Sequence, residues 1–135
     1  MGKIKNILLA YDFSDCSKNA LKRALKLAHE SQAKISVIHA IDPDVPSPYV
    51  ASLEGDLETQ IKEDLQKNLK SRIELDIQNH VDDHQKELNT EIQIGSVVVD
   101  QGLPYKMIVR HAIDDQADLI VMGSHSRSAL GSIFL

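Results

Sequence analysis

The chain has 135 residues, of which 42% are apolar and 26% charged, a mix typical of one globular domain and not of a disordered or collagen-like chain. The formal net charge of −5 argues against a nucleic-acid-binding surface, and no apolar run of about 18 residues is present that could cross a membrane. The single cysteine, Cys16, excludes an internal disulfide framework. We therefore expect one domain over residues 1–135, located in the reducing cytoplasm, with neither nucleic acid nor membrane as a partner.

The first part of the chain predicts a strand, a helix and a second strand. Residues 5–11 include a continuous apolar run, which is typical of a strand covered on both faces. Ser14 and Ser17 follow as candidate N-cap residues, and apolar residues then recur at helical spacing over 20–28. A second apolar run predicts a strand over 34–41.

The remaining segments continue this alternation. Prolines mark a loop across 42–52, and a helix is predicted over 53–88, where ten acidic and five basic residues indicate a solvated acidic face. A third strand is predicted over 91–100. The turn at 102–104 places a proline at the start of a short helix, and 118–123 is the fourth strand.

Strands separated by helices predict an α/β fold, an open parallel sheet with right-handed crossovers and helices on both faces. Ligands of such sheets bind beyond the carboxyl ends of the strands. The most distinctive end is Gly123, followed by three serines and Arg127. A glycine there lets backbone N–H groups approach an anion, and the hydroxyls and arginine add donors. From these residues alone, phosphate binding and an ordinary structural turn are both open interpretations.

Two segments resemble the universal stress protein family. Asn-Ile-Leu-Leu-Ala-Tyr-Asp-Phe-Ser, residues 6–14, resembles the first strand of that family, and residues 117–128 resemble its fourth strand and nucleotide loop. The resemblance extends over the whole chain. It implies a Rossmann-like sheet, similar to that of the adenine nucleotide alpha hydrolases, of order 3-2-1-4-5. Without the fifth strand, the order expected for this chain is 3-2-1-4.

The family includes members that bind ATP and members that do not, and the former carry Gly-x2-Gly-x9-Gly-(Ser/Thr). Gly123 matches the first glycine, but Ser126 occupies the second position and the third would be position 136. Asp12 matches a residue that hydrogen-bonds the nucleotide or helps to hold its Mg²⁺. The nucleotide-pocket residues that we predict are Ala10, Tyr11, Asp12, Ala40, Met122, Gly123, Ser124, His125, Ser126 and Arg127.

Catalytic and metal-binding roles find little support in the sequence. The chain has no Walker motif, nucleophile elbow or Cys-x-x-Cys pair, so we predict no catalytic residues and at most slow ATP hydrolysis. Cys16 has no evident base beside it, and His80 with His84 lacks a third ligand for a metal. His39 lies within a predicted strand, where we expect it to be packed and hydrogen-bonded.

These features lead to two hypotheses. The first is a small cytoplasmic stress-response module that binds ATP with Mg²⁺; the alternative is a dimeric signalling protein of the same fold that binds no nucleotide. We expect a homodimer in either case. Apolar residues after Arg127 have the spacing of an amphipathic helix that stops at residue 135. We therefore expect the sequence to be truncated, or its edge strand 118–123 to be covered by a partner subunit.

Overall fold

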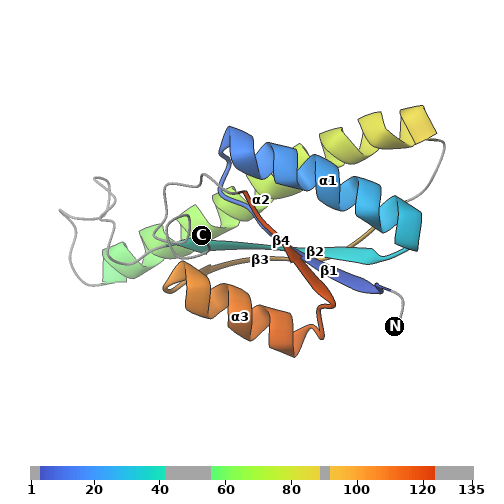
Figure 1. The fold of residues 1–135 in the computed structure, drawn as a ribbon. Coiled ribbons are helices and arrows are strands. Elements are labelled where there is room, and N and C mark those ends of the chain that lie inside the picture. Colours follow the sequence, from blue (N-terminus) through green and yellow to red (C-terminus); the bar gives the residue numbers. More distant parts are fainter. Residues whose placement is uncertain (1–3, 42–55, 89–91, 124–135) are drawn as a thin grey trace.

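The computed structural model describes residues 4–41, 56–88 and 92–123, and Figure 1 shows their arrangement. The four strands form one parallel sheet in the order β3-β2-β1-β4, which confirms the predicted fold and strand order. The predicted helix after Arg127 lies outside the described residues. In chain order the elements are β1 (Asn6–Ala10), α1 (Asp15–Ser31), β2 (Lys34–Ile41), α2 (Asp56–Leu88), β3 (Gln93–Gln101), α3 (Pro104–Asp114) and β4 (Leu119–Val121).

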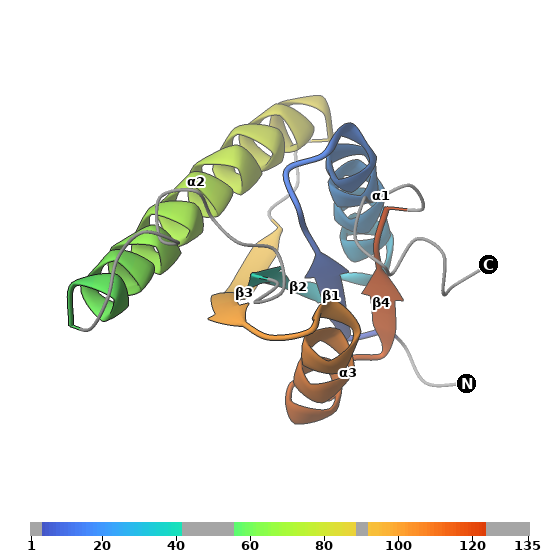
Figure 2. The same cartoon turned by 90° about the vertical axis from the view of Figure 1, so that its left-hand side faces the viewer.

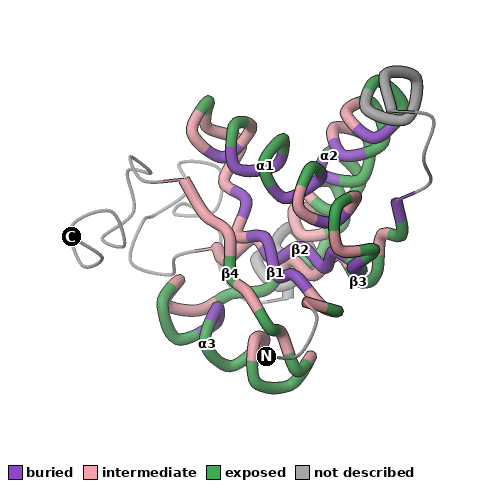
Figure 3. The backbone as a smooth tube through the Cα atoms, turned by 45° about the vertical axis from the view of Figure 1, so that its right-hand side comes forward, coloured by how far each residue is buried: buried purple, intermediate pink, exposed green. Residues whose placement is uncertain are grey.

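Helices cover both faces of the sheet, as predicted. Helices α1 and α2 lie on one face and α3 lies on the other (Figures 1 and 2). Strand β1 is buried on both sides, because Ile7 and Leu9 pack toward α1 and α2 while Leu8 packs with Ile108 of α3. The buried backbone in Figure 3 accordingly runs through β1, β2 and the inner side of α1. This double burial explains why the strand sequence is continuously apolar.

Helix α1 begins and ends at residues that its sequence favours. The Ser14 side chain is the N-cap and accepts a hydrogen bond from the Ser17 N–H at 3.1 Å. Small and branched apolar side chains at 20, 21, 24, 25 and 28 form the buried stripe. Gln32 ends the helix in the left-handed conformation, with φ of 57°. The N-cap prediction is therefore confirmed, and Ser14 rather than Ser17 fills the capping position.

Helix α2 is long but rests on the core over a short stretch. The described helix begins at Asp56, residues 53–55 of the prediction lie outside the described residues, and its buried side chains among those described are Ile73, Ile77 and Val81. Its first turns run past the edge of the sheet (Figure 2). The predicted solvated acidic face is present, with exposed carboxylates at Glu63, Asp64, Glu74, Asp82 and Asp83. In the parts of the chain that the structure describes, no helix combines the length and apolarity needed to cross a membrane.

Strand β4 is shorter than predicted. Its register with β1 runs from the Ile7–Leu119 pair to the Leu9–Val121 pair, so it spans three residues and not 118–123. Before the strand, Asp118 contacts the start of β1 through both its backbone and its side chain, and its N–H donates to the Asn6 carbonyl oxygen at 2.8 Å. Its Oδ2 accepts hydrogen bonds from the N–H groups of Lys5 and Asn6, at 2.8 and 3.0 Å. The carboxylate thus ties the start of β1 to the start of β4.

The Asp118 contact predicts a local stabilisation that depends on pH. The two backbone hydrogen bonds hold the pKa of the Asp118 carboxyl below its usual value. A depressed pKa means that the stabilisation is present above the unfolded-state value of about 3.9 and is lost as the pH falls through the folded-state pKa. We expect Asp118→Ala to speed amide hydrogen exchange at Lys5 and Asn6 at pH 6, and the wild type to lose this protection as the pH falls through the folded-state pKa of Asp118. Equal protection in the two proteins at pH 6 would contradict this account.

Candidate functional site

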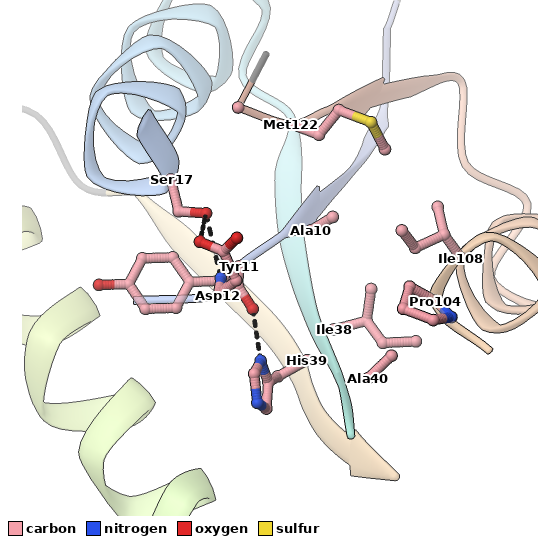
Figure 4. A pocket seen from close by; sticks show the side chains of 11 residues that line it. Ala10, Tyr11, Asp12, Ser17, Ile38, His39, Ala40, Pro104, Ile108 and Met122 are labelled. Atoms are coloured by element: carbon pink, nitrogen blue, oxygen red, sulfur yellow. Dashed lines mark hydrogen bonds between the residues drawn. The ribbon is translucent and has the colours of Figure 1, made fainter. Parts of the chain in front are cut away.

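A small pocket lies at the carboxyl ends of β1, β2 and β4. Strands β2 and β4 flank β1, so the chain direction across the sheet reverses here, which is where open α/β sheets bind ligands. The pocket has a volume of about 60 Å³. Figure 4 shows its lining side chains, which come from β1, β2, the segments that follow β1 and β4, α3 and the start of α1. The lining residues are Ala10, Tyr11, Asp12, Ser17, Ile38, His39, Ala40, Pro104, Ile108, Met122 and Gly123.

The part of the pocket on the α3 side of the sheet is an apolar slot. Ala10, the last residue of β1, and Ala40, the residue before the last of β2, have only methyl side chains and leave space above the sheet (Figure 4). Ile38 forms the floor between them, while Ile108 and Met122 form walls from α3 and from the segment after β4. Ala10, Ala40 and Met122 are among the residues predicted for a nucleotide pocket; they line this slot, and their contact with a nucleotide stays a prediction. Ile38, Pro104 and Ile108 were missed because their sequence signal is that of core and helix-start residues.

Asp12 supplies the charged end of the slot. Its Oδ1 accepts hydrogen bonds from the Ser17 hydroxyl at 2.5 Å and from the Ser14 N–H at 3.0 Å. Burial raises the pKa of the Asp12 carboxyl, but these hydrogen bonds and nearby His39 outweigh it, and the pKa lies below its ordinary value. Asp12 is therefore a carboxylate at neutral pH. Because both side-chain contacts with the described residues involve Oδ1, no described residue occupies Oδ2, which can accept a hydrogen bond from a ligand.

Ser17 is the polar residue of the pocket that the sequence did not single out as a site residue. Its side chain is 2% exposed, and its Oγ both donates to Asp12 Oδ1 and accepts from the Asp12 N–H at 3.0 Å. The Ser17 hydroxyl thus binds both the backbone and the side chain of Asp12. Asp12 and Ser17 are five residues apart, on either side of a helix start, a spacing that by itself signals only an N-cap.

Tyr11 and His39 line the pocket from the opposite side of the sheet. The ring of Tyr11 points away from the slot (Figure 4), and its hydroxyl donates to Asp76 Oδ2 of α2 at 2.9 Å. The Nδ1 of His39 lies 2.7 Å from the Tyr11 carbonyl oxygen; since a carbonyl only accepts, Nδ1 carries the proton. His39 is packed and hydrogen-bonded, as predicted. Tyr11 lines the pocket as predicted, but its side chain is directed at α2 and not into the slot.

Gly123 lies where β4 leaves the sheet, beside the first turn of α1. A Cβ placed on Gly123 would lie 2.7 Å from Cys16 Cβ and 2.8 Å from the Cys16 carbonyl carbon. The absence of a side chain is therefore required by the packing of the protein against itself. Of the two interpretations that the sequence left open, this packing supports a structural role for the glycine, and its role in the approach of an anion stays a prediction. Ser124, His125, Ser126 and Arg127, the remaining predicted site residues, lie outside the described residues.

The other candidate side chains do not assemble into a second centre. His80 Nδ1 donates to the Asp76 carbonyl oxygen of its own helix at 2.8 Å, and the side chain of His84 lies outside the description. Cys16 is a free, half-buried thiol. Across residues 4–41, 63–83 and 92–123, no three His, Cys, Asp or Glu side chains gather where they could hold a metal ion.

Comparison with known proteins agrees with the strand order of the sheet. A model of the universal stress protein family matches residues 3–135. The chain belongs to the universal stress protein family. A universal stress protein from Thermus aquaticus is 36% identical over 131 residues, which covers 97% of this chain and 85% of that protein.

Solved structures of this family share the fold. Protein MJ0577, a universal stress protein from Methanocaldococcus jannaschii, superposes with a TM-score of 0.69 at 27% identity, over 99% of this chain and 84% of that one. A universal stress protein solved in complex with cAMP superposes with a TM-score of 0.59 at 19% identity, over 98% of this chain and 84% of that one. The order β3-β2-β1-β4 is thus that of an established Rossmann-like fold.

Proposed function

We propose that this universal stress protein is a nucleotide-responsive module that binds ATP in the pocket at the ends of β1, β2 and β4. The observation that carries the proposal is an apolar slot closed at one end by the free Oδ2 of an ionised Asp12. Apolar walls suit the faces of a heteroaromatic base, and a carboxylate accepts hydrogen bonds from an amino group or ribose hydroxyls. One ligand class that presents both is a nucleoside.

The size of the pocket indicates that it holds only part of such a ligand. About 60 Å³ is far below the roughly 300–1,000 Å³ of small-molecule sites. We place the base in the slot and the phosphates toward Gly123, where Ser124, Ser126 and Arg127 follow in the sequence. Any Mg²⁺ would arrive with the phosphates, and Asp12 is the one carboxylate among the described lining residues that could share it.

The comparisons support a nucleotide as the ligand class. One structural neighbour of this fold was solved in complex with cAMP, which contains adenine and ribose. No described side chain is placed as a general base for attack on a phosphate, so we expect binding with at most slow hydrolysis. We further propose that the protein is a cytoplasmic homodimer built from one domain, residues 1–135.

The competing function is a signalling protein of the same fold that interacts with partners and binds no nucleotide. The observation that favours it is Ser126, at a position where ATP-binding members of the family carry glycine. A serine Cβ restricts positive φ at a place where backbone N–H groups would have to face a phosphate. The two functions differ in one measurable property, which is affinity for ATP.

Calorimetric titration with Mg-ATP tests the proposal, and Asp12→Asn locates the site. The asparagine keeps an oxygen for Ser14 and Ser17 but loses the acceptor at Oδ2, and a lost charge-assisted hydrogen bond of about 1.5–3 kcal/mol lowers affinity roughly 10- to 100-fold. Asp114→Asn, on the exposed part of α3, makes the same change in net charge and should leave affinity unchanged. An absence of heat and of any thermal shift with the wild type would favour the partner-binding alternative.

A further inference from the structure

The turn that carries Asp12 is attached to α2 by two side-chain contacts that are close together on the helix. Tyr11 donates to Asp76 at 2.9 Å, and the guanidinium carbon of Arg72 lies 5.3 Å from the centre of the Phe13 ring. Arg72 and Asp76 are four residues apart in a helix and so share one face. Asp12 lies between the two attached residues of the turn. The helix therefore holds the chain immediately before and after the carboxylate that faces the pocket.

Phe13 shows why the turn needs such support. Its φ of 66° lies in the left-handed region, which is uncommon and unfavourable for a bulky residue. The ring is held on several sides, with Tyr11 and His39 edge-on at centroid distances of 5.2 and 5.3 Å and Arg72 over its face. This backbone conformation directs Asp12 toward Ser14 and Ser17, with which it forms its hydrogen bonds. Contacts that hold the ring thus help to hold the carboxylate.

Tyr11 anchors the other end of the turn. Its side chain is 2% exposed, so its hydroxyl needs a partner inside the protein, and Asp76 provides it. Its backbone carbonyl accepts from His39, so that both its main chain and its side chain are fixed. A tyrosine hydroxyl is already protonated at neutral pH, and burial and then the hydrogen bond to Asp76 raise the pKa of Tyr11 further, so the hydroxyl is a donor.

We propose that Asp76 and Arg72 of α2 are positioning residues for ligand binding, which act through Tyr11 and Phe13 to fix the Asp12 carboxylate at the pocket. The inference rests on the proposed function for its affinity readout. Neither side chain is among the residues that line the pocket, so the effect on a ligand is indirect. A purely structural role, in which the contacts only fasten α2 to the sheet, predicts a change in unfolding without a local change in the turn.

The deciding variants are Asp76→Ala and Asp76→Asn in the full chain. Alanine removes the acceptor for Tyr11, whereas asparagine keeps an oxygen there. We expect Asp76→Ala to speed amide exchange at Ser14 and Ser17 in the ligand-free protein, and to weaken Mg-ATP binding about 2- to 10-fold, as the loss of one hydrogen bond allows. Asp76→Asn should keep most of the exchange protection at Ser14 and Ser17 and most of the affinity for Mg-ATP. Asp82→Ala, which removes an exposed carboxylate from the same helix, is the matched control and should change neither.

A double-variant cycle tests whether the effect passes through Tyr11. Because Tyr11→Phe removes the same hydrogen bond from the other side, Tyr11→Phe with Asp76→Ala should bind Mg-ATP no more weakly than the weaker of the two single variants. Additive losses would overturn the shared route. Arg72→Gln, at an exposed position, is a second variant in case Asp76→Ala does not fold, and it should speed exchange at Ser14 in the same way.

The exchange and affinity measurements separate the two proposals. If the wild type does not bind Mg-ATP, the proposed function fails, and the positioning inference is decided by exchange at Ser14 and Ser17 in the ligand-free chain. Unchanged exchange in both Asp76→Ala and Arg72→Gln would overturn the inference whatever the ligand. If the wild type binds Mg-ATP, and Asp76→Ala exchanges faster at Ser14 and Ser17 but binds Mg-ATP equally well, the inference is also overturned. The contact would then stabilise the turn without positioning the ligand.

Discussion

Replacing Gly123 by valine is expected to lower the free energy of unfolding by about 3 kcal/mol, the upper part of the range for overpacked sites. The first added carbon would lie 2.7 Å from Cys16 Cβ and 2.8 Å from the Cys16 carbonyl carbon. One of these atoms belongs to the backbone of the first turn of α1 and cannot rotate away, so the helix start must shift. That shift would also displace Ser17 and, with it, the hydrogen bonds of Asp12.

Gly102 offers a matched control for this prediction. A Cβ there would lie 2.6 Å from the sulfur of Met107, which belongs to a flexible side chain. Gly102→Ala should therefore cost well under the roughly 3 kcal/mol expected for Gly123→Val. Urea unfolding measures both variants, and titration with Mg-ATP shows whether binding falls together with stability. A Gly123→Val protein as stable as the wild type would contradict the prediction, because it would show that the start of α1 can shift without lowering the free energy of unfolding.

Replacing Ile73 by alanine is expected to destabilise the protein by about 2–5 kcal/mol, as is usual for a large aliphatic side chain removed from a core. Ile73 is 0% exposed and belongs to the short buried stretch of α2, one turn from Ile77. Few other described side chains of this 33-residue helix are buried, so the loss falls on the contact that keeps α2 against the sheet. Leu75, two residues further on, is 61% exposed.

Leu75→Ala is consequently the control, since it removes an apolar side chain of similar size from the same helix. It should change the free energy of unfolding by less than about 0.5 kcal/mol, as is usual for surface positions. Chemical denaturation of both variants decides the matter. Comparable losses at 73 and 75 would mean that the exposed side of α2 also contributes to the stability of the fold.

The sequence by itself determined the elements and their order along the chain, and the resemblance to the family implied their order in the sheet. Apolar runs such as 34–41, the serine before α1 and the proline at the start of α3 are local signals, because each depends on neighbours a few residues away. With helices between successive strands, the parallel sheet follows. The resemblance to the family then placed Ala10, Asp12, Ala40, Met122 and Gly123 at the pocket, and these residues do line it.

The tertiary structure decided what these side chains do. Tyr11 turns to Asp76, which is 65 residues away, and Gly123 is needed by Cys16, 107 positions earlier in the chain. Ser17 and Ile108 join the pocket because α1 and α3 are packed on opposite faces of the sheet. No periodicity in the sequence carries this information. Hydrogen bonds and close contacts require distances between segments that are correct to within a few tenths of an ångström, and those distances are set only when the helices pack on the sheet.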